Sequence, residues 1–210
     1  MFLVQEILRV RNTRQSEAIK RLNWIHSLMQ PQPGFAWALV ARYLGNPTDY
    51  LILRVFESGD AFRAFRQTEE GQNYSKNRPE GLYEGVPVGR QWDLRIDSPG
   101  SAKGDYLVRS VYGVGPDDAD EFVENRKRHD GLALQVPGTA SLQTFACLDD
   151  TEEHKGTFLC LARRTDRDAY NAYLESPQSA EYRQGNRRGL YKTLGTECYE
   201  VVDEVFPSSK

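Results

Sequence analysis

Two ionisable residues occupy helix positions that are apolar elsewhere in the same chain. Leu22 and Ile25 of one predicted helix correspond, 104 residues later, to Arg126 and His129 of another. An ionisable side chain at a core-facing position costs free energy unless it is paired, solvated or functional. His129 could act as a general acid or base near neutral pH, and Arg126 could hold an enolate, a carboxylate or a phenolate. The alternative is a slightly rotated helix that leaves both side chains exposed.

Aromatic residues on predicted strands and helices form a second group of candidates. Tyr112 stands where the first copy has Leu8, and a tyrosine can orient a phenolic substrate or donate a proton. We therefore expect catalytic roles for Tyr112, Arg126 and His129. The tyrosines that recur in both copies also fit a structural role, and a strand tryptophan could simply pack inside the fold. Substrate contacts are expected from four further residues, which are Tyr182, Arg109, Trp92 and Tyr74.

The cysteines and histidines show no metal-ligand pattern. The three cysteines are odd in number and lack CxxC spacing, and the three histidines are scattered without an HExxH motif. We therefore expect no metal site and no disulfide framework. Reduced thiols in a cytoplasmic protein are the preferred interpretation.

These candidates lie in a chain that is an internal duplication. Residues 60–65 read DAFRAF and residues 168–173 read DAYNAY, at an offset of 108, and Gly-Leu-Tyr follows each at residues 81–83 and 189–191. Upstream, Pro33-Gly34 matches Pro137-Gly138 at an offset of 104. The four-residue difference falls where a hairpin loop can absorb an insertion at low cost. Repeats of this spacing indicate two copies of one structural unit.

Each copy predicts the element order β-α-β-β-α-β. Runs of strand length rich in β-branched and aromatic residues alternate with amphipathic stretches, and Ser58 and Asp166 are suitable N-caps for the second helix of each copy. The predicted strands cover residues 2–10, 35–44, 50–56 and 90–96 in the first copy, and 106–114, 139–148, 157–163 and 197–202 in the second.

Right-handed crossovers in this order give a four-stranded antiparallel sheet with both helices on one face. The other face is bare and apolar and must be covered, which two copies achieve by pairing sheet to sheet. The predicted fold class is α+β, with two tandem ferredoxin-like repeats forming an intramolecular dimeric α/β barrel. We expect repeat 1 at residues 1–97, a linker at 98–104, repeat 2 at 105–205 and a tail at 206–210.

The stretch TDRDAYNAYLESP at residues 165–177 resembles antibiotic biosynthesis monooxygenase-like domains of the dimeric α/β-barrel superfamily. The resemblance covers both copies and implies a small-molecule cavity between each sheet and its helices. Members include cofactor-free oxygenases of aromatic polyketides, isomerases and haem-degrading enzymes. The asparagine, tryptophan and histidine of the haem-degrading branch are missing, since Arg109, Arg164 and Tyr182 stand near those places in the second copy. We expect no cofactor, with haem as the remaining candidate.

Composition limits the possible partners. The 210 residues are 39% hydrophobic with a net charge of −3, which argues against a disordered chain and against non-specific nucleic-acid binding. No apolar run is long enough to span a membrane, and Met1–Val4 runs into Gln5 and Glu6, so we expect no secretory leader. A homodimer of the pseudo-dimer is compatible with this pattern.

We expect a small-molecule-binding protein that resembles cofactor-independent monooxygenases or isomerases and acts on a small, partly aromatic substrate. The alternatives are a non-catalytic ligand-binding or regulatory module, or a haem-binding protein of the same superfamily. The interior separates them, because an enzyme needs an open pocket that His129 or another base faces.

Overall fold

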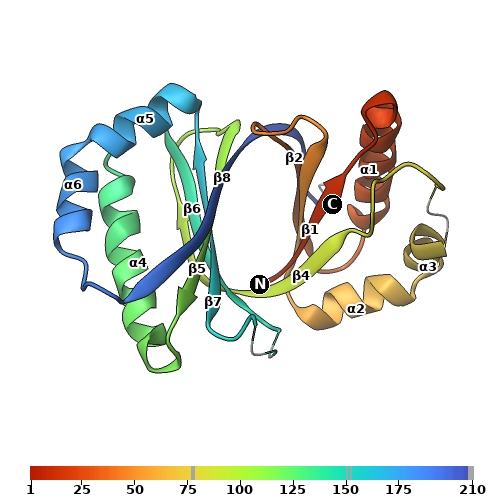
Figure 1. Ribbon diagram of the computed structural model, residues 1–210. Helices are drawn as coiled ribbons and strands as arrows, with labels where there is room; N and C mark the ends of the chain where they lie inside the picture. Colours follow the sequence, from red (N-terminus) through yellow and green to blue (C-terminus); the bar gives the residue numbers. More distant parts are fainter. Residues whose placement is uncertain (77–78, 150, 152, 208–210) are drawn as a thin grey trace. The chain divides into compact units, whose positions relative to one another are not determined.

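The computed structural model describes residues 1–76, 79–149, 151 and 153–207 (Figure 1). The elements follow the predicted order in both copies. The strands are β1 (Phe2–Arg9), β2 (Phe35–Tyr43), β3 (Asp49–Phe56), β4 (Val88–Pro99), β5 (Tyr106–Val114), β6 (Thr139–Cys147), β7 (Thr157–Arg164) and β8 (Tyr191–Val205). The helices are α1 (Gln15–Met29), α2 (Gly59–Gln67), α3 (Glu69–Lys76), α4 (Ala119–Ala133), α5 (Arg167–Glu175) and α6 (Pro177–Gln184).

The second helix of each copy is broken into two. Thr68 and Ser176 have extended backbones, at ψ 160° and 152°, and each lies between two short helices. Ser176 precedes Pro177, and a residue before proline is forced out of the helical region. The Ser176 hydroxyl then caps α6 by accepting the Ser179 N–H at 3.1 Å. The break directs α5 and α6 separately over the sheet.

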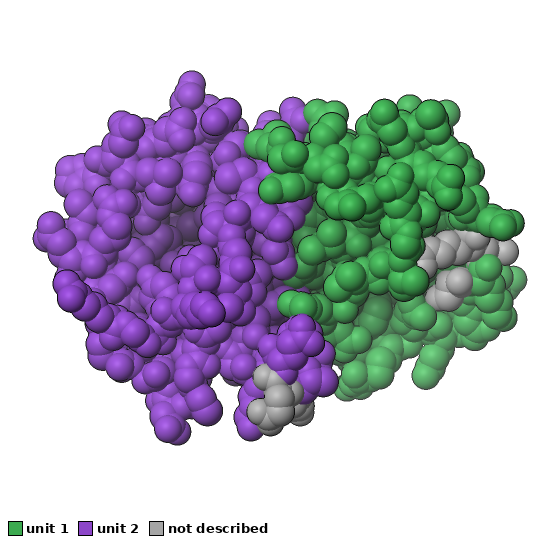
Figure 2. Space-filling view, in the orientation of Figure 1, with its two compact units in different colours: residues 1–91, 201–210 green, residues 92–200 purple. Residues whose placement is uncertain are grey.

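The chain divides into two compact units (Figure 2). Unit 1 comprises residues 1–91 and 201–210, and unit 2 comprises residues 92–200. Strands β4 and β8 each continue from one unit into the other, so the units cut across the sequence repeats. The compact units and the sequence repeats are different divisions of the chain, so the expected boundaries of the repeats, at residues 97 and 105, stay a prediction. The first residues of the expected linker, Ser98 and Pro99, belong to β4 because they pair with Leu142 and Ser141 of β6.

Within each unit a central strand pairs antiparallel with two neighbours, β3 with β1 and β2 in unit 1, and β7 with β5 and β6 in unit 2. In unit 2, β5 also pairs antiparallel with β8 through Glu200 and the residues before it. Helices α1–α3 cover one face of the sheet in unit 1, and α4–α6 do so in unit 2 (Figure 1). The predicted α+β class is confirmed, with two β-α-β-β-α-β repeats and an antiparallel sheet covered by helices in each unit.

The recurring Pro-Gly and Asp-Ala pairs contact each other in both copies. Gly34 and Gly138 have φ values of +74° and +84°, which L-residues rarely adopt. A Cβ built on either glycine would lie 2.7 Å from the Ala61 Cβ or 2.6 Å from the Ala169 Cβ. The turn before β2 or β6 thus packs against the first turn of α2 or α5, and both partners must be small.

The two units differ in what fills the space between sheet and helices. In unit 1 this space holds a continuous apolar core that includes Leu22, Ile25, Ile52, Phe56 and Phe65. In unit 2 the apolar contacts include two separate clusters, one around Phe122 and Phe158 and one around Leu142 and Tyr173. Polar and charged side chains occupy positions in unit 2 that are apolar in unit 1. No helix among the described residues is long and apolar enough to cross a membrane.

Candidate functional site

A cavity of about 220 Å³ lies in unit 2 between the sheet and its helices. Strands β5 and β7 supply alternate residues, because every second side chain of a strand points to the same face. The helices supply titratable groups from above. The lining includes Val108, Ser110 and Tyr112 of β5, Cys160, Ala162 and Arg164 of β7, Arg126 and His129 of α4, Tyr173 of α5 and Tyr182 of α6.

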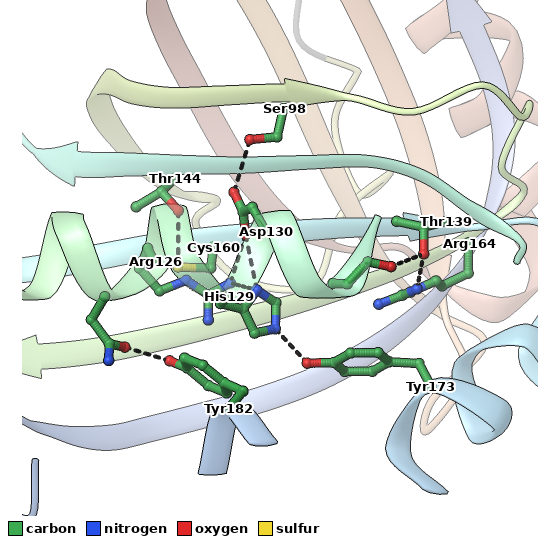
Figure 3. A network of polar contacts seen from close by, with 12 residues as sticks. Ser98, Arg126, His129, Asp130, Thr139, Thr144, Cys160, Arg164, Tyr173 and Tyr182 are labelled. Carbon is green, nitrogen blue, oxygen red and sulfur yellow. Dashed lines mark hydrogen bonds and ion pairs between the residues drawn. The ribbon is translucent and has the colours of Figure 1, made fainter. Parts of the chain in front are cut away.

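A chain of short polar contacts runs from the cavity into the protein (Figure 3). The Tyr173 hydroxyl oxygen lies 2.6 Å from Nε2 of His129, and Nδ1 of His129 lies 2.9 Å from Oδ1 of Asp130. The other carboxylate oxygen of Asp130 accepts the Ser98 hydroxyl at 3.1 Å. Ser98 is on β4, so a strand helps to hold this part of α4 in place.

Two groups with opposite requirements lie beside Nδ1 of His129, since Asp130, which can only accept, and Arg126, which can only donate, are both 2.9 Å away. The tautomer with the proton on Nδ1 satisfies Asp130. Nε2 is then unprotonated and accepts the Tyr173 hydroxyl. Arg126 Nη2 lies 2.9 Å from Nδ1 and 3.5 Å from Oδ1 of Asp130, and with this tautomer it acts on Asp130 as an ion pair.

Burial and charge keep the His129 ring neutral. Burial and, to a smaller extent, the adjacent Arg126 guanidinium lower the pKa of His129 to about 4 against the opposing effect of Asp130. At neutral pH the ring is therefore uncharged, and one of its nitrogens is free of a proton. Burial also raises the pKa of Tyr173 and of Tyr112 above the usual value. The arrangement suits transfer of one proton along Tyr173, His129 and Asp130.

A second buried arginine lies at the other side of the same cavity. Arg164 is 1% exposed, its guanidinium carbon lies 4.3 Å from the centre of the Tyr173 ring, and it donates to the Thr139 hydroxyl. Burial lowers the pKa of Arg164. Tyr182 also faces the site, with its ring centre 4.7 Å from that of His129 and its hydroxyl donating to Asn125 at 2.6 Å.

Four of the predicted residues come together and three do not. His129, Arg126, Tyr112 and Tyr182 line one cavity, so α4 is not rotated to expose the first two, which are 7% and 6% exposed. The remaining three are Arg109, Trp92 and Tyr74, and each is placed elsewhere.

Arg109 lies on the opposite face of β5 from Val108 and Ser110, and pairs with Glu197 at 2.8 Å. Trp92 is fully buried on β4, opposite Cys147 of β6, and is outside the cavity lining. Tyr74 belongs to unit 1, where it lines a different cavity of about 260 Å³ together with Glu6, Leu8 and Arg21.

Three site residues were not singled out from the sequence, namely Asp130, Tyr173 and Arg164. Their counterparts in the first repeat are His26, Phe65 and Phe56. The comparison of copies that draws attention to Arg126 and His129 would have found these three as well. Every member of the buried polar network on α4, α5 and β7 differs in type from its partner in the first copy.

The histidines do not fit a haem ligand. Both ring nitrogens of His129 already have partners at 2.9 Å or less, His26 is fully buried in unit 1, and His154 lies 4.0 Å from Asp149 in a loop. Among the described residues, no three His, Cys, Asp or Glu side chains gather as a metal site would require.

Comparison with known proteins agrees with this architecture. Residues 1–77 match the family model of antibiotic biosynthesis monooxygenases. A candidate monooxygenase from Fusobacterium nucleatum superposes with a TM-score of 0.80 at 14% identity, covering 98% of this chain and 94% of its own. A candidate monooxygenase from Lactobacillus acidophilus gives 0.78 at 12% identity, covering 98% and 95%.

A third solved structure, described as an anthrone oxidase-like protein, gives a TM-score of 0.69 at 15% identity and covers 99% of this chain and 94% of its own. No curated protein matches the sequence. Identities this low establish the fold and leave the reaction open. Residues 1–77 thus resemble antibiotic biosynthesis monooxygenases, and over its whole length the chain has the same fold as these candidate monooxygenases.

Proposed function

We propose that unit 2 is a cofactor-independent oxygenase or isomerase that removes a proton from a small aromatic substrate. The observation that carries this proposal is the Tyr173–His129–Asp130 chain, which begins at a cavity and ends on a buried carboxylate. A base, a group that orients it and an adjacent space for a reacting molecule are the parts that proton abstraction needs.

The proton moves in two coupled transfers. The substrate gives its proton to the Tyr173 oxygen as the Tyr173 proton passes to Nε2 of His129. The resulting imidazolium is stabilised by Asp130, whose role resembles that of the carboxylate in a serine-protease triad. Arg126 lies within the same cavity and stabilises the negative charge that develops on the substrate.

Two outcomes are open to the carbanion formed in this way. With dioxygen as co-substrate, a CH₂ group becomes a carbonyl, one oxygen atom stays in the product and the other leaves as water. Without dioxygen, return of the proton to a different carbon gives an isomer. Neither route needs a bound cofactor, because the electrons come from the substrate.

The size of the cavity limits the substrate. A cavity of about 150 Å³ is known to hold benzene, so a volume of about 220 Å³ suits one substituted aromatic ring. The rings of Tyr112, Tyr173 and Tyr182 offer stacking and edge contacts to such a ring. Likeness to candidate monooxygenases and to an anthrone oxidase-like protein supports the reaction class.

The competing function is non-catalytic binding. It is favoured by the fact that the Tyr173 hydroxyl and both His129 nitrogens are already engaged with one another and with Asp130. A purely structural network would look the same in the absence of ligand. The two functions differ in whether His129 accepts a proton when a substrate binds.

Deuterium exchange separates these functions. Phenylpyruvate and its uncharged methyl ester each carry acidic benzylic protons next to a single ring, and their exchange in deuterium oxide is followed by proton NMR. We expect the protein to accelerate exchange of at least one of them. His129→Ala and Tyr173→Phe should each slow the protein-dependent rate by about a hundredfold or more.

The matched control is Tyr50→Phe, which removes a buried tyrosine hydroxyl from unit 1, 3.3 Å from Gln15, and should leave the rate unchanged. Melting curves of all variants show whether folding is retained. Exchange that His129→Ala leaves intact would contradict the proposed base, and oxygen uptake with ¹⁸O₂ distinguishes oxygenation from isomerisation.

A further inference from the structure

The cavity of unit 2 holds more buried positive charge than the described residues neutralise. Arg126 is balanced by Asp130 at 3.5 Å. In the part of the chain that the structure describes, Arg164 has neutral partners, the Thr139 hydroxyl and the face of the Tyr173 ring. Its Nε atom is buried without a hydrogen-bond partner among the described residues. A buried charge of this kind is costly unless something pairs with it.

The fold itself does not require this charge. The equivalent residue in unit 1 is Phe56, which is fully buried in the apolar core. The same strand position in the same fold is therefore stable with an aromatic hydrocarbon side chain. The arginine in unit 2 therefore buries a charge that this strand position does not require, which points to a role in binding a ligand in the cavity.

Arg164 also has the right position to orient a ligand. It lies at one side of the cavity, on the last residue of β7, and Tyr173 lies between it and His129 (Figure 3). A group held by Arg164 would leave the rest of a small molecule beside the Tyr173 hydroxyl. Arg183, which is exposed, also lines this cavity and adds positive charge.

We infer that the ligand of unit 2 is an aromatic carboxylate, with its carboxylate held by Arg164 and its ring among Tyr112, Tyr173 and Tyr182. A guanidinium presents its N–H groups in a planar fork that matches a carboxylate. The volume of about 220 Å³ accommodates a ring with one acidic substituent. This inference rests on the cavity of the proposed function and specifies the substrate class for it.

The test is direct binding and does not need turnover. Benzoate and benzamide have the same ring and nearly the same shape but differ in charge, and calorimetry gives the affinity of each for the full chain. We expect benzoate to bind at least about tenfold more tightly than benzamide, the range that a charged hydrogen bond supplies. Inorganic phosphate, a third probe, should bind more weakly than benzoate.

Three variants identify the residue responsible. Arg164→Phe introduces the side chain that unit 1 carries and should abolish the preference for benzoate, whereas Arg164→Lys should retain part of it. Arg187→Met removes one positive charge from the same unit, where Arg187 pairs with Asp118 and Glu121 at the surface, and should keep the full preference. Melting curves verify that each variant is folded.

Several results would overturn the inference. Equal affinity for benzoate and benzamide, tighter binding of phosphate than of benzoate, or a preference unchanged in folded Arg164→Phe would each do so. Failure of the proposed function gives a different pattern. Benzoate is still preferred over benzamide, but the His129→Ala variant replaces substrate protons by deuterium as fast as the unaltered protein does. If Arg164→Phe does not fold, Arg164→Lys still tests the inference through its reduced preference.

Discussion

His129 shows how single residues in this site set one another's protonation. The ring adjoins a carboxylate, which would normally favour the imidazolium, yet burial and the Arg126 guanidinium outweigh it and lower the pKa to about 4. In the proposed mechanism Asp130 accepts the Nδ1 proton in a hydrogen bond and stabilises the imidazolium that proton transfer forms. The residue is thus a neutral base throughout the physiological pH range.

Arg126→Leu tests this balance at the level of the residue. The change introduces the side chain that unit 1 has at Leu22 and removes the positive charge beside the ring. We expect the pKa of His129 to rise from about 4 toward 6.5, since the second-largest cause of the lowering is lost. This pKa is measured by NMR, from the chemical shift of the His129 imidazole protons between pH 3 and pH 8.

The same variant should shift the pH dependence of substrate exchange. A base must be unprotonated, so activity falls as the pH drops through the pKa of His129, and the fall should begin at a higher pH in Arg126→Leu. His26 and His154 are distinguished from His129 by their own substitutions. A pKa of His129 that stays near 4 would show that burial alone, without Arg126, sets it.

Helix α5 carries two cavity residues, and a local sequence signal, its N-terminal cap, fixes where the helix begins. Its N-terminus is fixed by Asp166, which accepts the Ala169 N–H at 2.8 Å, and the following turns carry Tyr170 and Tyr173 into the cavity. In unit 1 Ser58 caps α2 in the same way through the Ala61 N–H at 3.1 Å. The cap and the small residue facing Gly138 together set the angle at which α5 leaves β7.

The two caps provide a matched pair of substitutions. Asp166→Ala and Ser58→Ala should each lower the free energy of unfolding by about 1 kcal/mol, measured by urea denaturation. Only Asp166→Ala should also weaken benzoate binding, because the first turn of α5 frays and Tyr173 loses its fixed position. Equal effects of the two variants on benzoate affinity would show that the cap does not position the site.

At the scale of the whole molecule, we expect the free energy of unfolding to fall when the pH is lowered. His26 is fully buried in unit 1, its ring nitrogens have no hydrogen-bond partner among the described residues, and Asp203 lies 3.7 Å away. Burial, and to a smaller extent the charge of Arg54, lower the pKa of His26 to about 3. Both buried histidines therefore bind a proton more readily in the unfolded chain than in the folded one.

The sign of the effect follows from linkage. The pKa of His26 is lower in the folded chain than the value of about 6.5 in the unfolded chain. Its contribution to the free energy of unfolding is therefore fully present above pH 6.5 and is lost as the pH falls toward 3. Between pH 7.5 and pH 5 the loss from His26 is about 2 kcal/mol. His26→Leu should lack this loss, so its free energy of unfolding should fall less on acidification.

Urea denaturation at pH 7.5 and at pH 5 gives the comparison, with His154→Leu as the control from a loop. That control should lose stability on acidification as the unaltered protein does. Equal losses of free energy of unfolding in the unaltered protein and in His26→Leu would contradict this prediction. They would show that protonation of His26 does not destabilise the fold, because the imidazolium pairs with Asp203.

Sequence alone determined the duplication and the order of the elements, and it singled out two positions of α4 whose burial the structure then decided. These features depend on local patterns, namely the spacing of DAFRAF and DAYNAY, the helix caps, and the exchange of Leu22 and Ile25 for Arg126 and His129. Each is encoded within a few turns of helix or one strand. The fold class follows from the same patterns because packing of amphipathic elements leaves few alternatives, whereas the open cavity in unit 2 depends on how the side chains pack.

The tertiary structure decided which strand residues join the site. Most of β5 is buried on both faces, so its sequence shows no alternation, and nothing local indicates that Ser110 faces the cavity while Arg109 faces away. A shift of one residue would exchange the two faces. Likewise, Tyr173 contacts His129, and Arg164 lines the same cavity, only because segments more than thirty residues apart pack together, which no local pattern encodes.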